Sequence, residues 1–185
     1  GPSRLGITKP DITASGDVSL SSGPLSLLNN PASWGVVDSG GWHVRNGGTS
    51  MASPVVAGIA ALYLEKCKYG TYSTFKNLLI SGAFTDGFTG TVPNNAYGYG
   101  KAHGLNVLLN AVVEPTPFIT QSGNVLTSSP SLNYQWIKDS VDLSGEMNAT
   151  LSLFPPNGYY QVYTVSSDGC PSYSAPYLGI LGLND

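Results

Sequence analysis

Apolar positions follow a helical pattern in the first part of the chain and a strand-like pattern in the rest. Residues 50–67 are apolar on nearly every face, which predicts a buried central helix. Pro54 fits its first turn, where the missing N–H does no harm. Residues 72–82 carry an apolar stripe that predicts a second helix, with Ser73 as its N-cap. A third helix is predicted over about 101–112.

The second part of the chain alternates short β-prone runs with turn signals. Spacing of this kind predicts a small antiparallel β-sandwich. Trp136 is expected to anchor its core, and Tyr160 and Val162 are expected to share one face of their strand, inward or outward. The predicted strands cover residues 118–120, 124–127, 133–138, 150–154, 159–165 and 177–181.

The segment before the first helix is rich in Gly, Ser, Pro and Asn. Residues 9–12, followed by Ala14 and Gly16, indicate a short strand that ends in a turn. Residues 17–47 indicate long loops with short extended pieces. A loop of this length is unusual in a compact domain, so we expect it to be functional or to pack on partners outside this chain.

The composition excludes several classes of protein. Only 10% of the 185 residues are charged, whereas a soluble domain typically carries about a quarter, and the low charge favours a secreted protein. The net charge is −3 without a Lys/Arg cluster, which argues against nucleic-acid binding. Residues 51–64 form the longest apolar run, which is too short to span a bilayer. Residues 1–3 do not have the pattern of a signal peptide.

The two cysteines, Cys67 and Cys170, lie in different predicted modules. No Cys/His spacing suits zinc. We expect two unrelated free thiols, with a disulfide between the modules as the alternative.

Candidate chemistry is concentrated in residues 47–50, Gly-Gly-Thr-Ser. The glycine pair allows a tight turn, after which Ser50 stands at the start of the buried helix. Free N–H groups and the helix dipole at that end can stabilise an oxyanion. The alternative is that the residue only caps the helix, because a serine without a base is not a nucleophile.

The string GTSMASPVVAGIAALYL, residues 48–64, resembles the nucleophile segment of the subtilisin family of serine proteases. Residues 9–16 resemble the family's KPDI-x-A-x-G strand, and residues 97–102 resemble its GYG-x-A entry to a late helix. The resemblance covers about residues 1–112. It implies an α/β fold, the C-terminal portion of a subtilisin-like parallel-sheet domain.

The resemblance also assigns roles to three neighbouring residues. Ser50 matches the nucleophile, and its backbone N–H matches one oxyanion donor. Thr49 matches a residue whose hydroxyl lies near the oxyanion hole, and Met51 matches the methionine beside the nucleophile. The reaction implied is peptide hydrolysis by acyl transfer on a protein or peptide substrate. No organic cofactor is implied; calcium is common in the family, but the chain has no run of acidic ligands that places an ion.

In this family the triad order is Asp, His, Ser, and the Asp and His segments precede the KPDI strand. The chain contains no DSGV-like or HGTH-like string. His43 and His103 lack the family's sequence context, so we expect surface or supporting roles for them. Asp11 and Asp38 are expected to be structural, Asp11 through local turn or strand-end hydrogen bonds.

The chain alone is therefore expected to be inactive. We expect residues 1–112 to pair with an N-terminal partner segment that carries the Asp and His, to self-associate through exposed apolar surface, or to be partly disordered. A non-catalytic binding, adhesion or spacer chain with a vestigial protease remnant is the alternative function.

Residues 118–185 resemble the small Ig-like modules that follow catalytic domains in secreted bacterial proteins. The resemblance is carried by residues 134–136, 158–160 and 168–170. Residues 113–117 form a short Pro-containing linker before this module. We expect the module to be a structural spacer, with carbohydrate binding, partner binding or export as alternatives. The parent protein is expected to be secreted and bacterial.

Overall fold

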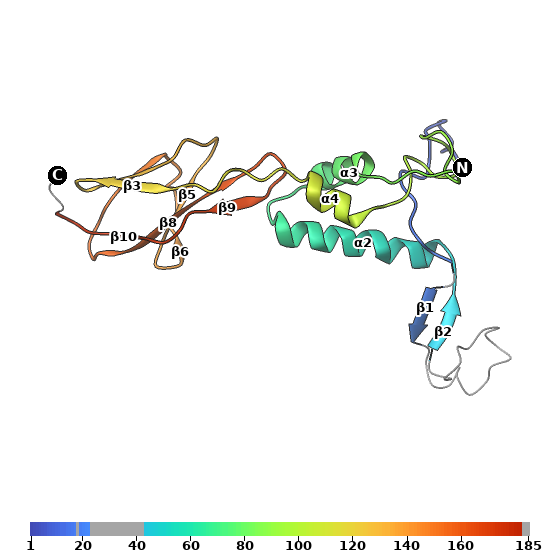
Figure 1. Cartoon of the computed structure of the whole chain (residues 1–185), viewed down its shortest axis with the longest axis horizontal. Helices are drawn as coiled ribbons and strands as arrows, with labels where there is room; N and C mark the ends of the chain where they lie inside the picture. Colours follow the sequence, from blue (N-terminus) through green and yellow to red (C-terminus); the bar gives the residue numbers. More distant parts are fainter. Residues whose placement is uncertain (18, 23–42, 183–185) are drawn as a thin grey trace. The chain divides into compact units, whose positions relative to one another are not determined.

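The computed structural model describes residues 1–17, 19–22 and 43–182, which fall into two compact units (Figure 1). The first unit contains Gly1–Leu62 and Lys76–Val107. The second contains Tyr63–Phe75 together with the chain from residue 108 onward. The linker predicted at residues 113–117 would leave residues 63–75 in the first unit. In the structure, residues 63–75 belong to the same compact unit as the strands.

Three helices follow in the order that the apolar pattern predicts. They are α2 (Thr49–Lys66), α3 (Tyr72–Ser81) and α4 (Gly104–Asn110). Helix α4 is shorter than predicted and begins at Gly104, where a Cβ would lie only 3.3 Å from Cγ1 of Ile59 in α2. The absent side chain therefore allows α4 to approach α2 closely.

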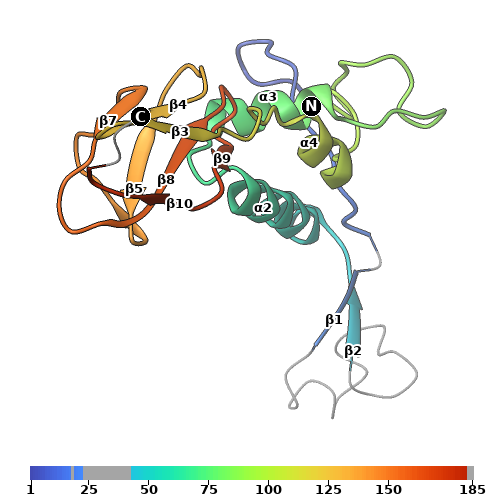
Figure 2. The ribbon, with the colours of Figure 1, turned by 60° about the vertical axis from the view of Figure 1, so that its left-hand side comes forward.

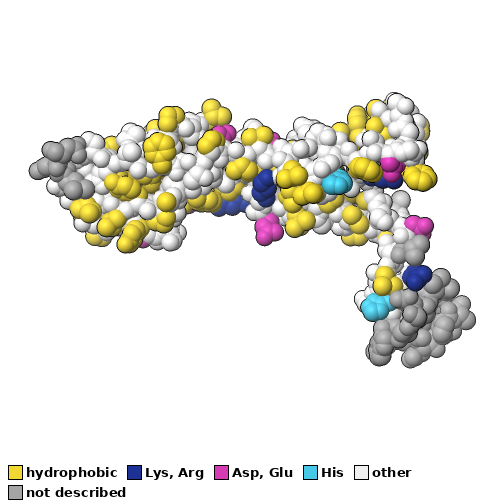
Figure 3. Space-filling model, viewed as in Figure 1, with side chains coloured by type: hydrophobic (Ala, Val, Ile, Leu, Met, Phe, Trp, Pro, Cys, Tyr) yellow, Lys and Arg dark blue, Asp and Glu magenta, His cyan; other side chains and the backbone are white. Residues whose placement is uncertain are grey.

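Helix α2 is less buried than its sequence predicts. Only Ile59 and Tyr63 are buried along it, whereas Val55 is 42% and Leu62 50% exposed. The expectation of a fully buried helix is wrong for the described residues, because they cover only part of its circumference. Figure 3 shows hydrophobic side chains exposed over the helices.

The N-cap of α3 is Thr71 and not the predicted Ser73. The backbone N–H of Thr74 donates to Oγ1 of Thr71 at 3.2 Å. Ser73 already lies inside the helix, two residues after Thr71, so its side chain cannot cap the first N–H groups.

The predicted strand at residues 9–12 is not formed as a regular strand. Thr13 makes an isolated parallel bridge with Lys101, through bonds from Thr13 N to Gly100 O at 2.9 Å and from Ala102 N to Thr13 O at 2.7 Å. Within the predicted loop, β1 (Ser19–Ser22) and β2 (His43–Asn46) form an antiparallel pair. Residue 18 and residues 23–42 of that loop lie outside the described residues.

The second unit holds two antiparallel sheets (Figure 2). One has the strand order β3-β4-β7, and the other β10-β8-β5-β6 with β9 also paired to β8. All six predicted runs contain strands, while the short β6 and β9 were missed. The bounds are β3 Ile119–Ser122, β4 Val125–Ser128, β5 Gln135–Lys138, β6 Val141–Asp142, β7 Thr150–Ser152, β8 Gly158–Val165, β9 Pro171–Tyr173 and β10 Tyr177–Gly179.

Both sheets contribute to one apolar core around Trp136, which is fully buried as predicted. Its indole N–H donates to the carbonyl of Asn148 at 2.8 Å, which satisfies the buried polar atom. Tyr160 and Val162 both face this core, as expected for two residues on one face of their strand. The alternation is incomplete, because Tyr163 is also buried. The buried members are Leu126, Trp136, Leu151, Leu153, Tyr160 and Val162.

The two cysteines form a disulfide within the second unit, so the expectation of free thiols is wrong. Both are almost completely buried. The bond joins the residue after α2 to the turn between β8 and β9. Their separation of 103 residues hid this proximity from local sequence patterns.

Hydrogen bonds hold the same two segments together. The N–H of Tyr69 donates to the carbonyl of Gly169 at 3.1 Å, and the hydroxyl of Tyr63 donates to the carbonyl of Asp168 at 2.6 Å. Gly169 has a φ of 79°, and a Cβ there would collide with the backbone of Tyr69 and Gly70. Glycine is thus required both by conformation and by close approach.

A tyrosine cluster surrounds the ammonium group of Lys68 beside this disulfide. Its Nζ lies 4.9 Å from the ring centroid of Tyr69 and 5.6 Å from those of Tyr163 and Tyr173. Hydrogen bonds to the hydroxyls of Tyr173 and Tyr69 raise the pKa of Lys68, which keeps it cationic. These cation–π contacts hold the 67–70 turn against β8 and β9.

Candidate active site

The candidate nucleophile lies at the first turn of α2. Gly48 precedes the helix with a φ of 138°, a conformation that favours glycine. Its carbonyl accepts from the N–H of Met51 at 3.0 Å and of Ala52 at 3.3 Å. The N–H groups of Thr49 and Ser50 donate to no acceptor within the described part of the chain. Ser50 is exposed, so its N–H can donate to another molecule.

The turn before the helix is joined to the 10–16 segment. The N–H of Gly48 donates to the carbonyl of Gly16 at 2.6 Å. This long-range bond brings the KPDI-x-A-x-G string and the GTS string together. The two motifs on which the family resemblance rests are therefore neighbours in the structure. The turn that carries Ser50 is therefore supported from outside its own helix.

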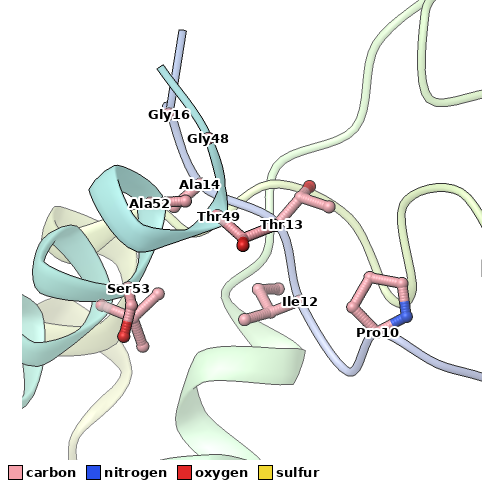
Figure 4. A pocket seen from close by; sticks show the side chains of 10 residues that line it. Pro10, Ile12, Thr13, Ala14, Gly16, Gly48, Thr49, Ala52 and Ser53 are labelled. Atoms are coloured by element: carbon pink, nitrogen blue, oxygen red, sulfur yellow. The ribbon is translucent and has the colours of Figure 1, made fainter. Parts of the chain in front are cut away.

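A cleft of about 460 Å³ lies between the 10–16 segment and the start of α2 (Figure 4). Thr49 lines it, but Ser50 and Met51 are not among its lining residues. The reason is helical geometry, because residues three or four apart share a face and Ser50 lies about 100° around the helix from Thr49. The lining consists of Pro10, Ile12, Thr13, Ala14, Gly16, Gly48, Thr49, Ala52, Ser53 and Val56.

Sequence reasoning did not single out Ser53 or Ile12 as cleft residues. The helical face formed by residues 49, 52, 53 and 56 could have been read from their spacing. The opposing wall could not, because it depends on the long-range bond between Gly16 and Gly48.

One main-chain edge of the 11–14 segment has no partner in the described residues. The carbonyl of Asp11 accepts from Tyr99, and Thr13 bonds to Gly100 and Ala102. Within the described ranges, the backbone groups of Ile12 and Ala14 form no hydrogen bond. Alternate residues of an extended chain direct their N–H and C=O groups to opposite sides, so this open edge can accept another strand.

In the described part of the chain, neither His43 nor His103 forms a hydrogen bond with Ser50. His43 begins β2 and lies opposite Ser22. Nδ1 of His103 accepts from the backbone N–H of Asn106 at 3.2 Å, so the imidazole helps to cap the start of α4. This local role agrees with the supporting role expected from the sequence.

The carboxylate of Asp11 forms ion pairs with Lys9 and Lys76. Hydrogen bonds from Lys9 and Lys76 lower the pKa of Asp11. The structural role expected of Asp11 agrees with these pairs and with the bond that its carbonyl accepts from the N–H of Tyr99. Only the contact with Lys9 is local, whereas Lys76 and Tyr99 are distant in the sequence. Asp38 lies outside the described residues.

A second cavity of about 430 Å³ has Thr13, Lys101 and His103 among its lining residues. The ammonium of Lys101 pairs with the carboxylate of Asp86 at 2.6 Å. The hydrogen bond from Lys101 lowers the pKa of Asp86. This cation is therefore neutralised by a protein carboxylate.

The described ranges contain no group of three His, Cys, Asp or Glu side chains that could hold a metal ion. None of the described helices is long and apolar enough to cross a membrane.

The sequence model of the subtilase family matches residues 1–100. Among solved structures, the chain is similar to fervidolysin from Fervidobacterium pennivorans, a keratinolytic enzyme related to subtilisin, at 19% sequence identity and a TM-score of 0.40. The match covers 89% of this chain but 30% of that protein, so the chain spans less than a third of its length. A search of curated proteins found no match. Because the family model covers more than half of the 185 residues, the chain belongs to the subtilase family.

Proposed function

We propose that this chain supplies the nucleophile-bearing part of a secreted serine endopeptidase, with Ser50 as the nucleophile. The observation that carries the proposal is the family match over residues 1–100, which includes Ser50. The exposed position of Ser50 in the first turn of α2 supports it.

In the proposed reaction, Oγ of Ser50 attacks the peptide carbonyl and a histidine outside this chain accepts its proton. The negative charge that develops on the carbonyl oxygen is stabilised by the backbone N–H of Ser50. The partial positive charge at the start of α2 adds to this stabilisation. From the motif resemblance, we assign the hydroxyl of Thr49 to the neighbourhood of the same oxygen and Met51 to the position beside the nucleophile. Water then releases the acyl group.

The base and its carboxylate partner are proposed to come from a segment that docks on the first unit. The open edge at Ile12 and Ala14 supports a strand on that side. The apolar cleft and the exposed Val55 and Leu62 of α2 indicate surface that gains stability when covered. The 185-residue chain by itself is therefore inactive.

For the second unit we propose an Ig-like sandwich that acts as a spacer after the catalytic domain. Two antiparallel sheets around Trp136 support the fold. The buried disulfide supports an oxidising compartment, and hence secretion, because such bonds are rare in reducing cytosol.

Labelling with a fluorophosphonate, which reacts with activated serines, tests the function. The assembled protease, meaning the chain purified together with its partner segment, is compared with the isolated chain and with two alanine variants. We expect the assembled protein and Ser73→Ala to be labelled and to hydrolyse peptides, and Ser50→Ala and the isolated chain to do neither. Ser73 is an exposed helical serine that does not line the cleft, so it is the matched control. Labelling that survives in Ser50→Ala would disprove the assignment.

A further inference from the structure

Gly16 lies against the carbonyl that organises the first turn of α2. A Cβ at position 16 would be 2.6 Å from the oxygen of Gly48 and 3.0 Å from Cβ of Ala52. Real Cβ atoms do not approach other atoms to 2.6 Å, and the obstructing oxygen belongs to the backbone, so it cannot rotate away.

Space, and not backbone conformation, requires glycine at this position. Gly16 is not among the glycines with a positive φ. Its carbonyl accepts from Gly48 N at 2.6 Å, while the Gly48 carbonyl accepts from Met51 and Ala52. An added methyl group therefore pushes on the atom to which the helix's first two hydrogen bonds are made.

We propose that Gly16 is a positioning residue for Ser50, an inference that rests on the function proposed above. By admitting the Gly48 carbonyl, Gly16 sets the place of the turn and, through it, of the Ser50 hydroxyl and N–H. Both groups must meet the same substrate carbonyl, one as nucleophile and one as oxyanion donor. A displacement of about 1 Å in such a constellation can lower the rate roughly a hundredfold.

The test measures turnover per active site in the assembled protease carrying Gly16→Ala. A fluorophosphonate titration counts reactive sites, and kcat and KM for a peptide ester are then expressed per titrated site. The control is Gly87→Ala in the same unit, where a Cβ meets nothing within 4 Å and the φ is not positive. We expect Gly16→Ala to lower kcat per site roughly tenfold to a hundredfold with KM changed less than about twofold, and Gly87→Ala to change neither.

If Gly16 served only to stabilise the fold, Gly16→Ala would give a different result. In that case Gly16→Ala would lower the number of titrated sites while each remaining site kept its normal kcat, and the inference would be overturned. If Gly16→Ala does not fold, the double variant with Ala52→Gly, which removes the 3.0 Å contact and keeps the 2.6 Å one, is measured against the same two outcomes. Absence of labelling in the unsubstituted protein would refute the proposed function itself and is thus distinguishable.

Discussion

We predict that the disulfide makes a large contribution to the stability of the second unit, because it closes a loop that includes most of that unit's sequence. Cys67 and Cys170 are separated by 103 residues. In the chain-entropy treatment, a cross-link over about 100 residues stabilises the folded state by roughly 4.7 kcal/mol. Measured values are commonly smaller, about 2–4 kcal/mol. We therefore expect reduction to lower the free energy of unfolding of this unit by about 2–5 kcal/mol.

Urea unfolding of the oxidised and the reduced chain measures this difference. Fluorescence of the buried Trp136 reports on the second unit when Trp34 and Trp42 are replaced by Phe. The Cys67→Ala/Cys170→Ala chain is the control, because reductant should not change its midpoint. Equal midpoints for the oxidised and reduced chains would refute the reasoning and would mean that the bond does not constrain the unit.

Three smaller predictions follow from single side chains. Thr71→Ala should lower the free energy of unfolding by about 1 kcal/mol through loss of the α3 cap, while Ser73→Ala should change it much less; equal losses would contradict the cap. Thr164 has a buried hydroxyl that finds no hydrogen-bond partner among the described residues, so Thr164→Val should raise the free energy of unfolding by up to about 1 kcal/mol. A marked loss of stability would contradict this. The lowered pKa of Asp11 stabilises the fold above the unfolded pKa of about 4, and this contribution is lost as the pH falls through the folded value. Acid titration of stability should show Asp11→Asn losing less than the parent chain below about pH 4, and parallel curves would contradict the ion pairs.

Local pattern predicted most of the regular structure. The apolar periodicity placed α2 and α3 to within one or two residues, and the turn signals separated the six predicted strand runs correctly. Strands β6 and β9 were missed because neither gives a β-prone run: β6 has only two residues and β9 begins with a proline. Burial of α2 was overpredicted, because apolar side chains show that a surface favours being covered but not whether these residues cover it.

The candidate site was predicted only as far as its motifs extend. The string around Ser50 identified the turn and the helix start from residue types alone. The contact of Gly16 with Gly48 and the cleft wall at Ile12 depend on pairing between segments far apart in the sequence. The expectation of free cysteines was wrong for the same reason, since the position of Cys67 gives no information on a turn 103 residues away.

The covalent intermediate of the reaction tests the central claim most directly. The assembled protease is quenched with acid during turnover of a p-nitrophenyl peptide ester, digested and analysed by mass spectrometry. The account predicts about one acyl group per active site, attached to Ser50, in step with the burst of nitrophenol. An acyl group on Ser53 or on any other residue, or a Ser50→Ala protein that still shows the burst, would contradict it.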